Sequence, residues 1–348
     1  MKVAIIGAGA SGLMLGGLLT QKGYEVTIFD GNEKAGKKLY ITGKGRCNIT
    51  NLCDTDEFLK NVVRGEKFFR SAIYSFSPQD TVVFFENLGL ITKVERGNRV
   101  FPKSDKSSDV IKALLKHCKD VKFMYNSKVE KIVKTEKGFK IFLKNENPKE
   151  EKNVKGDYVA DKVVIATGGE SYKATGSDGS GYTLAKSFGH TIEKLVPALC
   201  PIKLKEDLKD LEGLSLKNVS LIAEIDGKKK ELFGEMLFTD CGISGPIALS
   251  MSSFINRAGN VKLSLDLKPV LTKEQLEKRL LRDFDSNKNK NLSYILKGLM
   301  PNSLSIFFAK KCGLNLEKKV HDILKEERKI IIDNLKSFPI SFNGLYPI

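Results

Sequence analysis

The chain has 348 residues, of which 41% are hydrophobic, and it carries a formal net charge of +16 from 58 Lys and Arg against 42 Asp and Glu. This length and apolar content favour two domains with packed cores. Six scattered cysteines without a C-x-x-C pair, and three distant histidines, argue against a disulfide scaffold, a zinc cluster and a dithiol redox centre. We therefore expect no bound metal and a reducing, cytoplasmic location.

The excess of positive charge admits two interpretations. A field of this sign attracts phosphate-bearing partners, nucleic acid among them. However, the lysines are spread along the whole chain, and no basic run is interleaved with aromatic residues. We therefore favour a solvated, lysine-rich surface over a nucleic-acid partner. The uncharged residues 3–21 contain five glycines and are not typical of a signal peptide or membrane span, so no membrane partner is expected.

The first thirty residues follow the order of a dinucleotide-binding unit. Residues 3–6 form an apolar, β-branched run that is typical of a buried parallel strand, and residues 11–22 predict a helix. Between them, Gly7, Gly9 and Gly12 give the G-x-G-x-x-G spacing. Gly7 allows a tight turn, Gly9 lets a pyrophosphate approach the backbone, and Gly12 lets the helix pack closely on the strand.

The residues around these glycines complete the pattern. The N–H groups at the helix start, at Ala10 and Ser11, and the positive end of the helix dipole are expected to face the phosphates. A second expected strand, residues 24–29, ends in Asp30, which lies 21 residues after Gly9 and suits a ribose hydroxyl pair. A lone G-x-G-x-x-G is weak evidence, and a glycine-rich helix start in some other α/β protein is the alternative. Strand, helix and acid together predict an adenine dinucleotide site.

A glycine-rich and lysine-rich loop follows over residues 31–51. Its glycines allow close backbone approach, and Lys37, Lys38 and Arg46 suit an anionic ligand. On spacing alone, an exposed basic loop without a ligand stays an open alternative.

With the first motif, residues 36–51 make this sequence resemble the BaiN-like, or aminoacetone-oxidase, family of bacterial FAD-binding proteins. That family has a K-L-x-x-T/S-G-x-G-R-C-N-x-T-N stretch beside the flavin. The matching positions are Lys38, Leu39, Thr42, Gly43, Gly45, Arg46, Cys47, Asn48, Thr50 and Asn51. The resemblance implies FAD as the cofactor. The contacts that it implies in this loop are Lys38, Gly45, Arg46, Cys47 and Asn48, and we add Lys37 because its charge suits an anionic ligand. Asp30 stands where the family usually has a glutamate, and its shorter arm should still reach the ribose.

The middle of the first domain predicts two helices and a small sheet. Ser77 is an expected N-cap, Gly89 closes that helix, and a second helix covers about residues 108–118. Three strand-like runs, interpreted as an antiparallel meander, follow at residues 121–125, 128–134 and 139–143. The resemblance implies that the backbone of Val129 touches the adenine. Residues 144–156 predict a charged, solvated loop.

A further buried strand, residues 161–166, ends in the sequence A-T-G-G. Doubly wound folds hold their ligands at the carboxyl ends of strands. The cofactor contacts expected here are Ala166, Thr167, Gly168 and Gly169. A plain strand-to-loop turn is the alternative. Residues 171–189 match the family's T-G-S-x-G-x-G-Y segment, but without a strand and acid of their own they predict no second dinucleotide site.

From about residue 193 short strands broken by turns predict an antiparallel, barrel-like unit over residues 193–267. Residues 234–246 resemble the signature of the family's inserted domain. Helices are expected over residues 268–336, where Thr272 is an N-cap and residues 316–335 have helical apolar spacing. Residues 268–336 contain 16 basic and 9 acidic residues, a net charge of +7, so a nucleic-acid surface would be sought here first.

We therefore expect an α/β chain: a doubly wound, Rossmann-like FAD-binding domain over residues 1–192 with an inserted barrel-plus-helices domain over residues 193–336. In the resembled family the chain then returns to finish the nucleotide domain and to supply further cofactor contacts. We interpret residues 337–348 as the start of such a return, truncated here. On that interpretation the 348-residue chain is expected to hold FAD weakly.

The expected activity is FAD-dependent oxidoreduction of a small organic substrate, with NAD(P)H as a candidate electron donor and the flavin supplying the hydride chemistry. The sequence identifies no catalytic acid or base, no substrate and no oligomeric state. Three alternatives stay open: a nicotinamide-dependent dehydrogenase, a flavoprotein acting on RNA, and a cofactor-poor truncated flavoprotein or non-catalytic binding module. A bound yellow chromophore separates the first of these from a flavoprotein, and salt-dependent RNA retention reveals the second.

Overall fold

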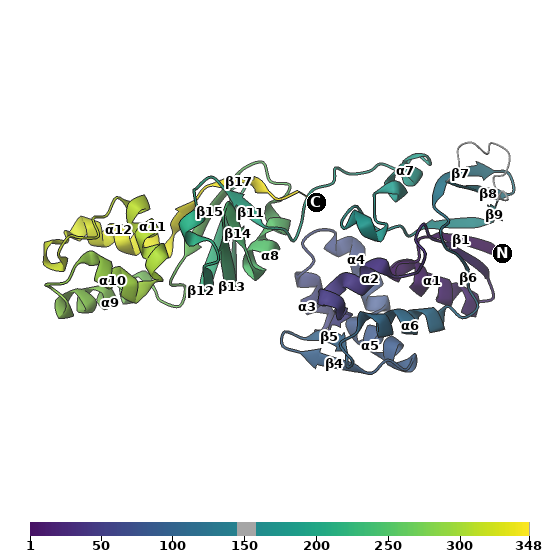
Figure 1. The fold of residues 1–348 in the computed structure, drawn as a ribbon, viewed down its shortest axis with the longest axis horizontal. Helices are drawn as coiled ribbons and strands as arrows, with labels where there is room; N and C mark the ends of the chain where they lie inside the picture. Colours follow the sequence, from purple (N-terminus) through teal and green to yellow (C-terminus); the bar gives the residue numbers. More distant parts are fainter. Residues whose placement is uncertain (145–157, 348) are drawn as a thin grey trace. The chain divides into compact units, whose positions relative to one another are not determined.

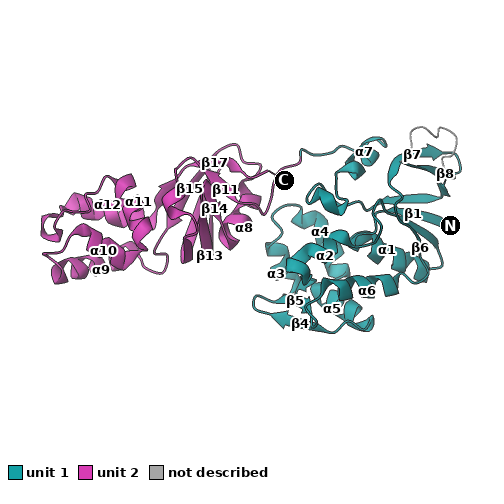
Figure 2. Ribbon diagram, in the orientation of Figure 1, with its two compact units in different colours: residues 1–194 teal, residues 195–348 magenta. Residues whose placement is uncertain are grey.

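The computed structural model describes residues 1–144 and 158–347 (Figure 1). It contains two compact units, Met1–Lys194 and Leu195–Ile348, coloured separately in Figure 2. The boundary expected from the sequence lies two residues earlier, after residue 192. Of the charged loop expected over residues 144–156, all but Lys144 lies outside the described residues. Within those residues, no helix combines the length and the hydropathy needed to cross a membrane.

Unit 1 is built on a four-stranded parallel sheet with the strand order β10-β1-β2-β6. The strands are β1 (Lys2–Ile6), β2 (Glu25–Phe29), β6 (Lys122–Met124) and β10 (Lys162–Ile165). Helix α1 (Ala10–Gln21) connects β1 to β2, which lies beside it in parallel. A parallel pair needs such a crossover, because its strands cannot be joined by a tight hairpin.

Two small antiparallel sheets and six further α-helices complete the described part of unit 1. One sheet contains β7 (Val129–Thr135), β8 (Gly138–Leu143) and β9 (Tyr158–Ala160), and the other contains β3 (Thr50–Asn51), β5 (Arg99–Pro102) and β4 (Thr92–Glu95). The helices are α2 (Lys37–Ile41), α3 (Thr55–Lys60), α4 (Glu66–Ser75), α5 (Pro78–Asn87), α6 (Ser107–His117) and α7 (Ser180–Lys186). Helix α5 begins at a capping box made by Ser77 and Asp80.

From Val3 to Ile6 both faces of β1 are buried, which explains why this part of the strand is apolar without interruption. Val3 and Ile5 belong to a core that includes residues of α1 and α6. Ala4 and Ile6 belong to a second core, formed with β7, β8 and β9. Successive side chains of a strand point to opposite faces, so the strand that leads into the glycine-rich turn is held from both sides.

One expected strand has a different partner from the one predicted. The sequence predicts an antiparallel meander that includes residues 121–125. In the structure β6 pairs in parallel with β2, and the third strand of the meander is β9. Helix α6 directly precedes β6 and supplies the crossover that parallel pairing requires.

Unit 2 contains a seven-stranded antiparallel sheet with the order β16-β15-β12-β13-β14-β11-β17. The strands are β11 (Ile202–Leu204), β12 (Ser215–Ile225), β13 (Lys228–Thr239), β14 (Gly242–Ser244), β15 (Val261–Asp266), β16 (Phe338–Ile340) and β17 (Phe342–Leu345). Only Ser341 separates the two outermost strands, β16 and β17. Since β16 pairs with β15 and β17 pairs with β11, one continuous segment joins both edges and closes the sheet into a barrel.

This closing segment corrects the interpretation of residues 337–348 as the start of a return to the first domain. Residues 338–345 instead complete the sheet of unit 2. Phe338 and Ile340 are buried in the core of that unit, whereas Pro339 between them is exposed. The alternation places the apolar side of the segment against the barrel core.

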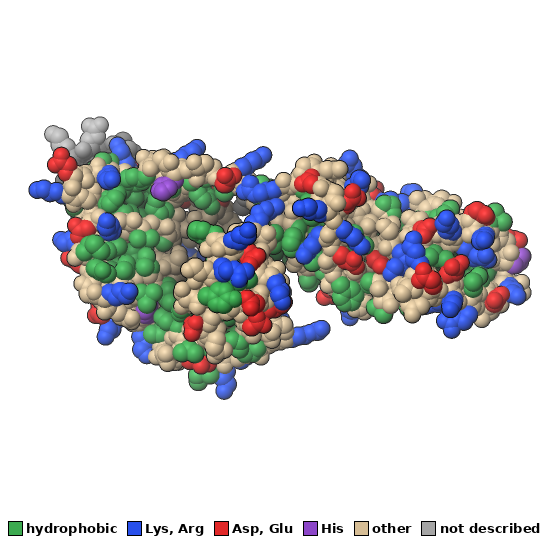
Figure 3. Space-filling view, turned by 180° about the vertical axis from the view of Figure 1, so that it is seen from behind, with side chains coloured by type: hydrophobic (Ala, Val, Ile, Leu, Met, Phe, Trp, Pro, Cys, Tyr) green, Lys and Arg blue, Asp and Glu red, His purple; other side chains and the backbone are tan. Residues whose placement is uncertain are grey.

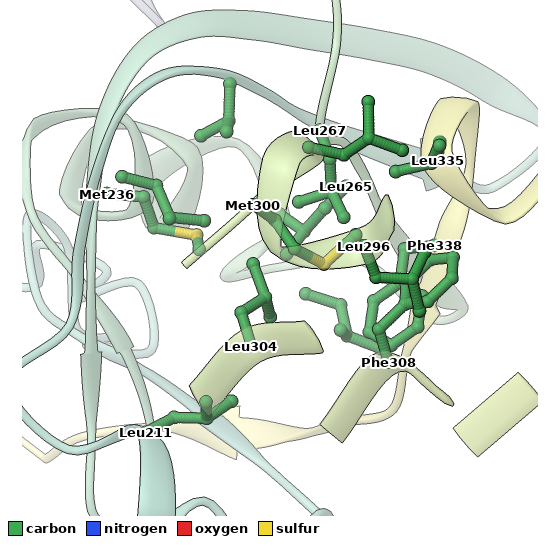
Figure 4. Close-up of a cluster of buried hydrophobic side chains, with 14 of the residues drawn as sticks. Leu211, Met236, Leu265, Leu267, Leu296, Met300, Leu304, Phe308, Leu335 and Phe338 are labelled. Carbon is green, nitrogen blue, oxygen red and sulfur yellow. The ribbon is translucent and has the colours of Figure 1, made fainter. Parts of the chain in front are cut away.

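Helices pack against the barrel and share its core. Helix α8 (Pro246–Ile255) follows β14, while α9 (Lys273–Ser286), α10 (Leu292–Leu299), α11 (Asn302–Cys312) and α12 (Lys325–Lys336) lie in sequence between β15 and β16. Figure 1 shows these last four gathered beside the strands. In the core, drawn in Figure 4, the Phe308 ring of α11 stacks on the Phe338 ring of β16 with centroids 5.3 Å apart. A parallel sheet with helices in one unit and an antiparallel sheet with helices in the other confirm the predicted fold class.

The helix expected over residues 316–335 is shorter in the structure. Helix α12 covers only its second part, and the preceding stretch runs beside the start of α10. There the N–H of Leu292 donates to the carbonyl of Lys318 at 2.9 Å, and Asn291 and Lys319 form an isolated antiparallel β-bridge. These long-range backbone bonds replace the local ones that a helix would have used.

Candidate functional site

A cavity of about 590 Å³ lies at the carboxyl ends of β1, β2 and β10 in unit 1. Parallel strands end at the same edge of a sheet, which is where doubly wound folds bind ligands. Eleven of the expected cofactor contacts line it: Gly7, Gly9, Ala10, Ser11, Asp30, Lys37, Lys38, Val129, Ala166, Thr167 and Gly168. Among the described residues, no group of three or more His, Cys, Asp or Glu side chains is arranged to hold a metal.

The three glycines of the first motif have different surroundings. A Cβ on Gly9 would meet no atom within 4 Å, so this backbone borders open space. A Cβ on Gly7, whose φ is +113°, would lie 2.5 Å from the carbonyl oxygen of Ala166. One on Gly12 would lie 2.0 Å from the carbonyl oxygen of Gly7. The fold therefore requires Gly7 and Gly12, whereas Gly9 keeps a space free at the cavity wall.

The start of α1 faces this space without a cap. Gly9 is the N-cap residue and makes no side-chain cap bond, the first turn contains no acid, and no side chain among the described residues accepts from its N–H groups. The first N–H groups of a helix have no partner within the helix, and the dipole makes this end positive. The arrangement suits an anion such as a diphosphate.

Asp30 joins the ends of β1 and β2. Its Oδ2 accepts from the N–H of Ala8 at 2.7 Å, and its Oδ1 accepts from the N–H and the side-chain amide of Asn32 at 2.8 and 2.9 Å. A carboxylate offers about four lone-pair positions, so these three bonds leave capacity for a further donor. Asp30 therefore shapes the glycine-rich turn as well as facing the cavity.

The two lysines at the start of α2 differ in their electrostatic surroundings. Lys37 forms an ion pair with Glu33 at 2.7 Å. Lys38 donates from Nζ to the hydroxyl of Ser171 at 3.3 Å, and the described residues give it no carboxylate partner. Burial lowers the pKa of Lys38. Lys38 is thus a cation at the cavity wall with its charge uncompensated by an acid.

The structure adds a wall that the sequence did not assign to the cofactor. Residues 173–178 and Ser180 line the cavity, as do Ser127 and Lys128. Lys128 and Asp178 form an ion pair at 2.5 Å, and the Lys128 ammonium holds the pKa of Asp178 well below its usual range. The match to T-G-S-x-G-x-G-Y was the available signal, but it did not reveal that these residues line the cavity.

Six expected contacts lie outside the cavity lining: Gly12, Gly45, Arg46, Cys47, Asn48 and Gly169. Arg46 binds the carboxylates of Glu95 and Asp105, and its guanidinium carbon lies 4.1 Å from the centre of the Phe101 ring. Hydrogen bonds to Glu95 and then to Asp105 raise the pKa of Arg46. In this structure Arg46 therefore fixes its loop to the hairpin of β4 and β5.

The neighbouring residues hold a strained turn. Cys47 is buried and has a φ of +59°, and Lys44 has the same φ, although side chains rarely adopt this left-handed region. Burial raises the pKa of the Cys47 thiol, which keeps it protonated. The Asn48 amide, in the orientation that satisfies both partners, donates to the carbonyls of Val100 and Thr50 at 3.2 and 3.1 Å. The Asn48 amide thereby joins this turn to β3 and β5.

A glycine-rich strand-to-helix turn, a strand-end acid and an open cavity beside them define a dinucleotide-binding α/β protein. The family described as the HI0933-like protein Rossmann domain matches residues 1–327. This chain belongs to that family.

Three relatives support the assignment. A 3-dehydro-bile acid delta(4,6)-reductase of Clostridium scindens is 31% identical over 315 residues, which are 87% of this chain and 73% of that protein. A ribosomal RNA dihydrouridine synthase of Haemophilus influenzae is 27% identical over 345 residues, covering 98% of this chain and 81% of the relative. The enzyme of the same name from Escherichia coli is 27% identical over 348 residues, with the same coverage of 98% and 81%. The resemblance inferred from residues 36–51 is confirmed, and the chain is a flavin-dependent oxidoreductase.

Proposed function

We propose that this chain binds FAD in the cavity of unit 1 and transfers hydride to or from a small organic substrate, with NAD(P)H as a candidate electron donor. The observation that carries the proposal is the open space at Gly9, before an uncapped helix, with Asp30 at the neighbouring strand end. The diphosphate and the ribose of a dinucleotide need these two features side by side. Membership of the family favours flavin over nicotinamide as the resident cofactor.

The residues of this chain would bind and orient the cofactor. The free N–H groups at the start of α1 would donate to the diphosphate, Asp30 would accept from a ribose hydroxyl, and the backbone of Val129 would border the adenine. Ala166 and Gly168 would form the facing wall. When bound, FAD supplies the hydride chemistry, while the protein supplies binding, orientation and electrostatics.

Visible absorption spectroscopy tests the cofactor. The protein is purified, titrated with FAD and passed through a desalting column. We expect a yellow protein whose chromophore, released by denaturation, has the mass of FAD. The ratio of visible to ultraviolet absorbance before the titration measures the fraction of the purified protein that carries FAD. A folded protein that stays colourless after titration would contradict the proposal, and retention of NAD(P)H instead would support a nicotinamide dehydrogenase.

A second candidate is a flavoprotein that acts on RNA. Two relatives are named as ribosomal RNA dihydrouridine synthases, and the net charge of this chain is +16. Figure 3 shows, however, that Lys and Arg side chains are dispersed over the visible face and intermixed with Asp and Glu. We therefore place a small organic substrate first. Retention of ribosomal RNA by the protein, measured across a series of salt concentrations, tests this candidate. An RNA substrate predicts binding that falls steeply with salt, and an absence of binding at low salt would exclude it.

We also propose a cytoplasmic location. All six cysteines are free thiols in the structure, and Cys47 and Cys118 are buried. Free thiols persist in reducing compartments. Thiol labelling of denatured protein from freshly lysed cells should modify every cysteine, and disulfide-linked species would contradict the assignment.

A further inference from the structure

Residues 171–180 are here called the strap, and seven of them, residues 173–178 and Ser180, line one wall of the nucleotide cavity. Side chains of the facing walls bind the strap at three places along its length. The contacts are Lys38 to Ser171, Asn32 to Thr175 and Lys128 to Asp178, at 3.3, 3.3 and 2.5 Å. The first partner belongs to α2, the second follows β2, and the third directly precedes β7. The strap is therefore tied to three separate elements around one cavity.

The strap is held mainly by these polar contacts. Of its side chains, Ser177 is buried, whereas Tyr172 is 72% exposed. Its backbone turns through left-handed residues, with φ of +53° at Tyr172, +94° at Gly176 and +83° at Gly179. A segment with few buried apolar contacts opens at low free-energy cost compared with the core of its domain. Its closed position consequently depends on the residues that fasten it.

The fastening between Lys128 and Asp178 lies at the end of the cavity where the adenosine is proposed to bind. Lys128 precedes Val129, and its Cβ lies 3.2 Å from the position that a Cβ on Gly31 would occupy, next to Asp30. Asp178 also accepts from the N–H of Ser180 at 3.0 Å, which orients its carboxylate. The ion pair thus connects the wall that carries the proposed ribose acceptor to the strap.

We propose that the ion pair between Lys128 and Asp178 fastens the strap over the adenosine end of the cavity, and that a bound adenine dinucleotide leaves only after this pair opens. Lys128 and Asp178 are positioning residues in this scheme, because they act through the strap. The inference rests on the proposed function, since it requires FAD in the cavity. It adds a determinant of FAD retention that lies outside the glycine-rich motif.

The test measures release of FAD by flavin fluorescence after rapid dilution of the loaded protein. Asp178→Asn keeps the acceptor for Ser180 but removes the charge, and Lys128→Met removes the other partner. A partly exposed ion pair changes an equilibrium by up to about fivefold, so release should become about three- to fivefold faster in both variants. The charge-reversed double variant, Lys128→Asp with Asp178→Lys, should return the rate toward that of wild type.

Glu170→Gln is the matched control. It breaks an ion pair of similar exposure, between Lys173 and Glu170 at 3.2 Å, that does not reach another wall. Its release rate should equal that of wild type. Wild-type release rates in both Asp178→Asn and Lys128→Met would overturn the inference and leave FAD binding intact. Slower association with unchanged release would also overturn it, and failure of the wild-type protein to bind any FAD would overturn the proposed function together with it.

Discussion

The carboxylate of Glu206 accepts a hydrogen bond from the backbone N–H of Ser341, 2.8 Å away, at the single residue between β16 and β17. Lys311 of α11 binds the same carboxylate, whose side chain is 12% exposed. Burial opposes its ionisation, but the Lys311 ammonium and the N–H groups of Glu206 and Ser341 outweigh burial and keep the pKa of Glu206 below its usual value. One acid therefore links the closing segment of the barrel to the helical part of unit 2.

Replacing Glu206 with Gln should lower the free energy of unfolding of unit 2 by about 1–3 kcal/mol at pH 7, because it removes a charged acceptor from a largely buried site. A depressed pKa contributes stability that is present above the unfolded pKa, about 4.3 for Glu, and is lost as pH falls through the folded value. The difference between wild type and variant should therefore shrink below about pH 4.3. Denaturant unfolding at several pH values measures it.

Asp333→Asn is the control for this prediction. Its ion pair with Lys273 is exposed on both sides, so the change in stability should be small. Equal unfolding free energies for wild type and Glu206→Gln at pH 7 would contradict the role of Glu206.

Gly9→Val should remove FAD binding and leave the fold intact, because the added side chain meets open space where the diphosphate is proposed to lie. Gly12→Val should instead unfold unit 1, since its Cβ would lie 2.0 Å from the carbonyl oxygen of Gly7. Circular dichroism and an FAD titration of both variants separate the two effects. A Gly9→Val protein that binds a full equivalent of FAD would show that this space is not the diphosphate site.

Asp30→Ala should weaken the binding of ADP by about 1–3 kcal/mol, roughly fivefold to 150-fold, because the ribose loses its acceptor. It should also lower the melting temperature, since the N–H groups of Ala8 and Asn32 lose theirs. Calorimetric titration with ADP measures the first effect and thermal unfolding the second. If only the melting temperature changes, Asp30 is a structural residue and the ribose has another partner.

Lys38→Met should weaken ADP binding about tenfold and leave adenosine binding unchanged, because a charge-assisted bond to phosphate is lost. Lys37→Met is the matched control: Lys37 is the neighbouring residue, but its charge is compensated by Glu33. Fluorescence competition against FAD compares ADP with adenosine for each variant. Equal losses in both variants would show that the lysines act through general charge alone.

Arg46→Met should reduce thermal stability and increase protease cleavage near the hairpin of β4 and β5, with little change in FAD affinity. The reason is that Arg46 binds Glu95 and Asp105 and does not line the cavity. Arg46→Lys should restore part of the stability, because it keeps the charge but lacks the planar guanidinium that contacts both Glu95 and Asp105. A large loss of FAD affinity without a loss of stability would assign Arg46 to the flavin instead.

The parts of the fold that the sequence predicts are those decided by local chemistry. Gly9 and Asp30 have roles set by neighbours within a strand, a turn and a helix. Ser77 and Thr272 predict helix starts because an N-cap satisfies N–H groups two or three residues away, and both form capping boxes in the structure. Such features need no knowledge of distant partners.

The features that the sequence does not predict depend on pairing at a distance. A strand pattern over residues 121–125 does not show that the strand pairs with β2. In the same way, the residues of β16 and β17 do not show that these strands pair with β15 and β11. Likewise, Arg46 has the charge of an anion-binding residue, but only the fold shows Glu95 and Asp105 beside it. The type of a side chain limits the interactions that it can make, and the topology of the fold determines which partner lies within reach.

The barrel closure also has a consequence for the order in which unit 2 can fold. Ile202 pairs with Leu345, a partner 143 residues later in the chain. During synthesis, β11 and β15 are made before β16 and β17. The outer edges of β11 and β15 therefore lack their strand partners while α9 to α12 leave the ribosome. Contacts between residues so far apart in sequence form slowly, and unpaired strand edges favour association between nascent chains. The barrel of unit 2 can therefore close only after β16 and β17 have been synthesised. Until then, the yield of folded protein should depend on chaperones and on temperature.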